Sequence, residues 1–109
     1  MTAIVSITTF RGIGLHGRLA VQAPEWPVMS SEQLVTAGSG SKALSAYLAS
    51  GAGLLRICAI SASIRYAINK DATTDTVGSN SPILPVGGVE YIDLKPGGAS
   101  QLRVAIEEI

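Results

Sequence analysis

The chain contains one long run of alternating apolar and polar positions, from Leu54 to Asn69. In each half of this run the apolar residues occupy every second position, which is typical of a β-strand with one buried face. They are Leu55, Ile57 and Ala59 in the first half and Ile64, Tyr66 and Ile68 in the second. The two sets have opposite parity, so we predict a tight turn or a β-bulge at Ser61–Ala62 between them. This run is expected to form the centre of the core.

Shorter strand-like segments precede and follow this run. They cover residues 3–9, 32–37, 42–48, 89–95 and 102–106, with a brief apolar return at 83–85. Residues 42–48 also fit one or two turns of helix, but a helix this short is marginal in water, so a strand is the prediction. In the last segment, alternation places Leu102, Val104 and Ile106 on one face.

Turn-forming residues separate these segments. Gly, Pro, Ser and Asn recur at intervals of about ten residues, a spacing that favours an all-β fold, either an antiparallel β-sandwich or a small jelly roll. The 109 residues are 47% hydrophobic, which is enough for one core, so a single domain over residues 1–109 is expected. Its predicted core includes Ile57, Ile68, Leu94, Val104 and Ile106.

Residues from about 10 to 30 follow a different pattern and are expected to form an extended N-terminal arm. Glycines at positions 12, 14 and 17 make a helix costly and predict a flexible or tightly turned loop. Pro24 and Pro27 flank Trp26 closely and hold the backbone near polyproline II geometry. The segment Gly12–Val28 has too few apolar residues for a core of its own, so we expect it to be poorly ordered in a free monomer.

Trp26 is the candidate anchor of this arm. An aromatic residue on a stiff, exposed segment either folds back onto its own sandwich or docks into a partner, and the sequence leaves both open. In the second case the arm would supply a partner interface made of Leu15, Pro24, Trp26, Pro27 and Val28.

The segment Lys70–Ser81 is rich in Asp, Thr, Ser and Asn and is expected to be a long, solvent-exposed loop. Asp71 and Asp75 carry carboxylates that could bind a hard cation in principle, but their spacing is not that of an EF-hand loop. We therefore interpret them as solvated loop residues and predict no metal site.

Candidate catalytic residues are few. His16 is the single histidine, and no serine of the chain lies in a nucleophile-elbow motif that could pair with it. Gly12, Gly14 and Gly17 match the spacing of the dinucleotide-binding fingerprint, but no helix follows them to hold a pyrophosphate. Cys58 lies in the central run, where a buried thiol packs as a small hydrophobe. We expect no enzyme activity and no cofactor.

The charge balance and the hydropathy of the chain limit the classes of partner that it is expected to bind. Eight basic residues balance eight acidic ones, so no long-range field attracts nucleic acid or an anionic membrane. No apolar run reaches the ~18 residues needed to span a bilayer. The opening residues also lack the pattern of a secretion signal. A soluble protein made in the cytoplasm, without nucleic-acid or membrane partners, is expected.

The order of these segments resembles that of small structural proteins encoded by tailed bacteriophages and prophages. The resemblance runs through the opening strand IVSITTF, the proline-bearing VQAPEWP, the apolar return SPILPVG and the closing VEYIDLKPGGASQLRVAI. Its closest features are GAGLLRI, SIRYAINKDAT before a polar loop, and VEYIDLKPG before the terminal strand. It covers nearly the whole chain, and its motifs are turn and strand signatures without catalytic content.

The resemblance implies a β-sandwich virion component, associated with the head as a capsid decoration or cement protein. Its partners would be the major capsid protein or other virion proteins, together with its own copies, and a trimer is favoured because such proteins are often trimeric. One alternative is a tail or head–tail junction protein, in which the sandwich would form a ring. Another is a carbohydrate- or receptor-binding module on a fibre, which would rely on exposed aromatic residues among Trp26, Tyr47, Tyr66 and Tyr91.

Overall fold

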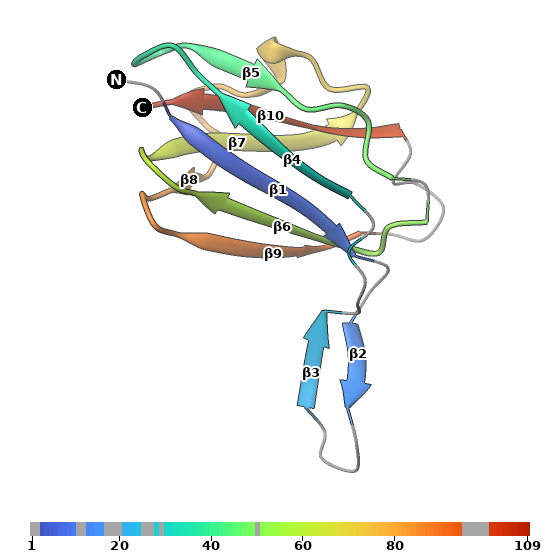
Figure 1. Cartoon of the computed structure of the whole chain (residues 1–109). Helices are drawn as coiled ribbons and strands as arrows, with labels where there is room; N and C mark the ends of the chain where they lie inside the picture. The colour runs from blue at the N-terminus through green and yellow to red at the C-terminus, as the bar shows by residue number, and fades with distance from the viewer. Residues whose placement is uncertain are drawn as a thin grey trace.

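The structure is a computed structural model that describes residues 3–10, 13–16, 21–24, 28, 30–49, 51–94 and 101–109. For residues 13–16 and 21–24 it describes the backbone only. Two four-stranded antiparallel sheets face each other and form a sandwich, and a separate two-stranded sheet lies beyond it (Figure 1). The expected all-β sandwich is therefore confirmed.

The first sheet has the strand order β4-β1-β6-β9. Its members are β4 (Ser30–Val35), β1 (Ile4–Phe10), β6 (Leu54–Ala59) and β9 (Val89–Asp93). Every neighbouring pair is antiparallel. The interior strands β1 and β6 are rich in β-branched and aliphatic residues, which suit a pleated surface buried on one side.

The second sheet has the order β5-β10-β7-β8. Its members are β5 (Lys42–Leu44), β10 (Leu102–Glu108), β7 (Ile64–Lys70) and β8 (Ile83–Leu84). The interior strands β10 and β7 have seven residues each, whereas the edge strands have three and two. Short edge strands offer few unpaired backbone groups to another chain, so both edges of this sheet are protected.

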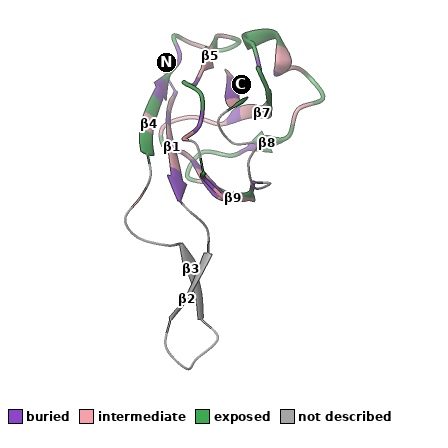
Figure 2. Cartoon of the chain, turned by 90° about the vertical axis from the view of Figure 1, so that its right-hand side faces the viewer, coloured by how far each residue is buried: buried purple, intermediate pink, exposed green. Residues whose placement is uncertain are grey.

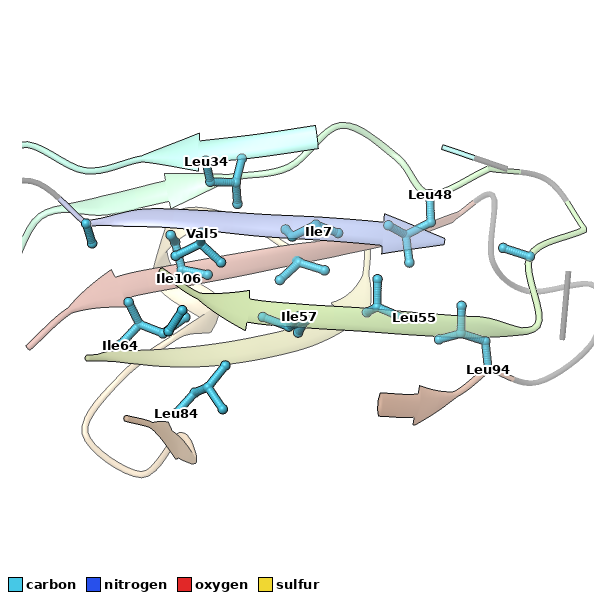
Figure 3. Close-up of a cluster of buried hydrophobic side chains, with 14 residues drawn as sticks. Val5, Ile7, Leu34, Leu48, Leu55, Ile57, Ile64, Leu84, Leu94 and Ile106 are labelled. Atoms are coloured by element: carbon cyan, nitrogen blue, oxygen red, sulfur yellow. The ribbon is translucent and has the colours of Figure 1, made fainter. Parts of the chain in front are cut away.

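The core lies between the two sheets (Figure 3). Among the predicted core residues, Ile57, Val104 and Ile106 are fully buried and Leu94 is 5% exposed. Ile68 is half-buried and packs against this cluster. The predicted core is confirmed, and it also receives Val5, Ile7, Leu34, Leu48, Leu55, Ile64 and Leu84.

The chain bends at 61–62, where a tight turn or a β-bulge was expected, and the change of parity comes from a change of sheet. β6 belongs to the first sheet and β7 to the second, and the bend at 61–62 carries the chain across the sandwich. The inner face of each sheet points toward the other, so the two strands must present residues of opposite parity to a common core. Alternation detected both strands correctly, but it contains no information on which sheet each strand joins.

The segment 42–48 is a strand only over Lys42–Leu44. Beyond it, the Ser45 hydroxyl accepts a hydrogen bond from the Val104 amide at 2.9 Å and donates one to the Ala46 carbonyl at 2.7 Å. A side chain thus occupies a position that a backbone carbonyl would hold in a regular ladder. The strand ends there, although Leu48 N still donates to the Leu102 carbonyl.

The long loop is less exposed than we expected. Asp71 and Asp75 are exposed, but Ala72 and Val77 are 3% and 0% exposed. A 3-10 turn, η1 (Thr74–Thr76), places this segment against the outer faces of β5 and β10. Because of this cover, Ala105 is fully buried although it lies on the outer side of β10.

The jelly-roll form of the sandwich remains a prediction. Successive strands pass between the sheets at β4–β5, β5–β6, β6–β7, β8–β9 and β9–β10. We can read the eight strands of the sandwich in chain order from β4 to β10 and count β1 last. The order of strands within the two sheets is then that of an eight-stranded jelly roll with two Greek keys. The start of β1 and the end of β10 are linked through Thr36, whose hydroxyl accepts from the Ala3 amide and donates to the Glu108 carboxylate.

Candidate functional site

The predicted arm contains a β-hairpin rather than an extended loop. β2 (Ile13–His16) pairs with β3 (Val21–Pro24) in antiparallel register. Leu15 lies opposite Gln22, and Pro24 lies opposite Ile13 at the end of the ladder. Proline is tolerated at such a terminal edge position of a ladder.

The remaining predicted interface residues are only partly covered by the structure. Val28 is half-buried. Trp26 and Pro27 lie outside the described residues, and so the two readings of Trp26 both stay open. The predicted interface therefore remains a prediction, and what the structure adds is the backbone framework of the hairpin that carries two of its members.

The hairpin is an insertion between two neighbouring strands of the first sheet. β1 and β4 pair directly, with Thr9 opposite Ser30, and the hydroxyls of these two residues are hydrogen-bonded to each other. β2 and β3 pair with each other and join neither sheet of the sandwich. Figure 1 shows the hairpin extending away from the end of the sandwich where β1 ends. The fold thus holds this two-stranded element at one end of a packed body.

No catalytic arrangement is found among the described residues. No group of three or more His, Cys, Asp or Glu residues lies close enough to hold a metal ion there. Asp71, one of the two aspartates considered above, accepts a hydrogen bond from the Tyr47 hydroxyl at 3.0 Å. Asp75 lies in η1 and is exposed. His16 is the last residue of β2, where only its backbone is described.

Cys58 is half-buried rather than fully buried. It lies opposite Ser6 and Val89 in the first sheet, on the outer face rather than in the core. Parity explains the difference, because Ile57 and Ala59 on either side point inward. The thiol is free, and within the described residues it has neither a histidine nor a second cysteine beside it.

One open pocket of about 400 Å³ lies where β7, β9 and β10 meet. Its wall is aliphatic, and Lys70, Asp93 and Gln101 are its polar members. The aliphatic lining consists of Ile68, Ile92, Leu94 and Leu102. Leu94 belongs to the core cluster and the other three pack against it, so the pocket is an opening into the core rather than a separate site.

A polar cluster lies at the outer side of β10. The Arg103 guanidinium carbon lies 4.8 Å from the centre of the Tyr47 ring, and its Nε donates to the Ser45 carbonyl at 2.8 Å. Arg103 therefore covers one face of the ring, which a sugar would need for stacking. Alternation and turn motifs did not indicate this cluster, because its members are up to 58 residues apart in the sequence.

The pKa of Tyr66 is raised above its ordinary value. Burial between the sheets raises the pKa of its hydroxyl, and the carboxylate of Glu90 raises it further. Both effects disfavour the phenolate, so Tyr66 stays protonated at neutral pH and acts as a packing residue with a polar tip.

Comparison of the chain with protein-family models, with curated protein sequences and with solved structures finds no match in any of the three. Among the described residues there is also no helix long and apolar enough to cross a membrane. The resemblance to phage structural proteins therefore rests on the sequence segments alone.

Proposed function

We propose that this chain is a non-enzymatic structural protein of a phage particle, a decoration or cement protein that stabilises the head. It would act by binding capsomers and its own copies, with a trimer as the favoured assembly. The sequence resemblance supports the particle, and one structural observation supports the binding role. This observation is the hairpin β2–β3, which is attached to the sandwich but paired with neither of its sheets.

A two-stranded hairpin is marginally stable at best in water, because it has no second layer to bury its apolar side chains. Each strand of this hairpin has only four residues. A partner surface laid against it would supply the missing layer. Trp26 follows β3 within two residues and is the large aromatic side chain available to anchor the contact.

The sandwich and the hairpin then have separate tasks. The body is held by a continuous core and keeps its shape without the hairpin, because β1 and β4 pair with each other directly through Thr9 and Ser30. The hairpin reaches a neighbouring subunit and gains order there. Binding through a short inserted element allows a small domain to bridge two shell proteins without rearranging its own core.

The test replaces residues 11–28 by Asn-Gly, which joins Phe10 to Met29 by a two-residue turn suited to a hairpin. The shortened protein should keep its thermal midpoint and its circular dichroism spectrum but lose cosedimentation with phage heads. A matched control carries Asp71→Asn and Asp75→Asn in the exposed loop and should cosediment as the unmodified protein does. Undiminished binding of the shortened protein would contradict the proposal.

Trp26→Ala probes the same contact at one residue. We expect a folded protein with an unchanged thermal midpoint and lower occupancy on particles, because burial of an indole contributes ~2 kcal/mol or more at an interface. If the substitution unfolds the domain, Trp26 belongs to the core of its own sandwich. Labelled images of virions would separate a head from a tail location, and a glycan array would test the receptor-binding alternative.

A further inference from the structure

The two edges of the first sheet are long and open. β4 has six residues and β9 has five, whereas the edge strands of the second sheet have three and two. Most side chains of β4 and β9 are exposed. A sheet edge of this length presents a row of backbone groups to which a further strand can be added.

Hydrogen bonds show which backbone groups of β4 face away from the sandwich. The Thr36 amide donates to the Ala3 carbonyl at 3.0 Å, so alternation along the antiparallel ladder makes the even-numbered residues of β4 bond to β1. The amide and carbonyl groups that point away from β1 are those of Ser31, Gln33 and Val35. No hydrogen bond from another described residue reaches these groups.

The same alternation applies to β9, the other edge. The Gly88 carbonyl accepts from the Ala59 amide at 3.1 Å, and the Leu94 amide donates to the Gly53 carbonyl at 2.9 Å. The even-numbered residues of β9 therefore bond to β6. The amide and carbonyl groups that point away from β6 are those of Val89, Tyr91 and Asp93. Each edge thus offers three residues to an added strand.

The two edges are complementary to each other. β4 and β9 run in opposite directions, because every neighbouring pair in the sheet is antiparallel. When two copies stand side by side in the same orientation, β9 of one copy therefore meets β4 of the next as an antiparallel partner. One register places the exposed valines Val35 and Val89, at 58% and 42%, directly opposite each other. The same register places the Ser31 hydroxyl beside the Asp93 carboxylate, which can accept its proton in a hydrogen bond.

Pairing of an edge with the same edge of another copy gives a poorer match. In the register of longest overlap, a two-fold contact between two β9 strands puts Val89 opposite Asp93, and one between two β4 strands puts Val35 opposite Ser31. Either contact also leaves the other edge of each copy unpaired. Head-to-tail pairing uses both edges, and such contacts form a ring when the rotation between copies closes.

Inward-pointing charges usually hinder the pairing of sheet edges, and each edge here carries one glutamate on its inner side. Both carboxylate oxygens of Glu32 accept from the Ala46 amide, at 3.2 and 3.1 Å, so this side chain is turned toward its own chain. In the register described above, Glu32 lies opposite Ile92 and Glu90 lies opposite Leu34. No like charges therefore face each other across the contact.

We infer that β9 of one copy pairs with β4 of the next copy, and that three copies close into a ring through three such contacts. The number of copies rests on the trimer of the proposed function, whereas the pairing rests on the two free edges. Each contact adds up to about six backbone hydrogen bonds, because three residues on each strand exchange them in pairs. The edges of the first sheet then bind copies of this chain, and the hairpin remains for the shell.

Engineered disulfides test the pairing and its register. The double variant Val35→Cys, Val89→Cys, made together with Cys58→Ser, places two thiols opposite each other at a Cα separation of ~5.5 Å, which a disulfide spans. Mild oxidation of the purified protein should yield covalent trimers that a reductant separates. The matched control Ser31→Cys, Val89→Cys, with the same Cys58→Ser change, has its thiols out of register and should give no cross-link.

Single variants distinguish the ring from a two-fold contact. Val35→Cys alone and Val89→Cys alone, each with Cys58→Ser, should form no covalent dimer, because head-to-tail pairing never brings the same residue of two copies together. A covalent dimer from either single variant would overturn the inference and indicate a two-fold contact.

Gln33→Pro tests the edge without a disulfide. Proline removes the outward amide of β4 and leaves the bonds to β1 in place. In sedimentation equilibrium the unmodified protein should move from a monomer of 11.2 kDa toward three times that mass as its concentration rises. Gln33→Pro should need about tenfold more protein or higher, since each contact loses a hydrogen bond. The control Gln33→Thr keeps the amide and should assemble like the unmodified protein.

Two results would overturn the inference. One is an unmodified protein that is monomeric at all concentrations, and the other is a double cysteine variant that gives no covalent trimer. If Gln33→Pro does not fold, the cross-links decide. The protein lacking residues 11–28 should still form the ring, because both edges lie outside the replaced segment. Failure of the ring is therefore distinct from failure of the head-binding proposal.

Discussion

The two sheets of the sandwich share one core but differ on their outer faces. The outer face of the second sheet is covered by the chain itself, because the segment around η1 lies against β5 and β10 and buries Ala105 and Val77. The outer face of the first sheet remains open over Val89 and Tyr91, and β4 at its edge is largely exposed (Figure 2). The long loop therefore covers the outer face of the second sheet, whereas the outer face of the first sheet remains available to neighbouring molecules.

The substitution with the largest expected effect tests the core, to which both sheets contribute. Ile57 is fully buried at the centre of the core, so Ile57→Ala should lower the free energy of unfolding by ~2–5 kcal/mol. Chemical denaturation followed by circular dichroism measures this change. A loss below about 0.5 kcal/mol is typical of surface positions and would show that the two sheets do not pack through this residue.

A matched pair of substitutions tests the difference between the outer faces. Val77 is fully buried in the cover of the second sheet, whereas Val89 on the first sheet is 42% exposed. Val77→Ala should cost about 1–2 kcal/mol of unfolding free energy, since each buried methylene contributes ~0.8 kcal/mol. Val89→Ala should change it by less than about 0.5 kcal/mol. Equal losses would mean that both outer faces are covered to the same extent.

The smallest effect concerns the hydroxyl of Tyr66 on the second sheet and the carboxylate of Glu90 on the first. Burial raises the pKa of Tyr66 first, and the Glu90 carboxylate raises it further, so the folded state binds this proton more tightly than the unfolded chain. The resulting stabilisation is complete below the unfolded pKa of about 10 and is lost as the pH rises through the folded pKa. Absorbance titration of the tyrosines should show one late component, absent in Tyr66→Phe and shifted to lower pH in Glu90→Gln. An unshifted titration in Glu90→Gln would show that the carboxylate does not act on Tyr66.

The sequence predicted the strands well because alternation reports directly on burial. Leu55, Ile57 and Ala59 are all buried on one face of β6, as their spacing indicated. Alternation did not predict which sheet each strand joins. It did not show that β6 and β7 join different sheets, because parity shows which side of a strand is buried but not which sheet lies on that side.

The loops were harder to predict because the position of each loop depends on one or two contacts. Ala72 and Val77 are two apolar residues in a polar segment, and their burial fixes the loop on the second sheet. Strand β5 stops because the Ser45 hydroxyl accepts from the Val104 amide, 59 residues away. The hairpin β2–β3 was missed because its glycines and prolines are equally common in irregular loops.

The position of β10 sets the order in which the domain can fold. This strand lies between β5 and β7 in the interior of the second sheet, yet it is synthesised after every other described strand. On the ribosome, all four strands of the first sheet emerge before β10, one of the two interior strands of the second sheet. Until then the core lacks Val104 and Ile106, and the Thr36 hydroxyl finds its acceptor, the Glu108 carboxylate 72 residues away, only at the end. The nascent chain is therefore most exposed to aggregation just before synthesis of β10, and chaperones that hold apolar surfaces would act in that interval.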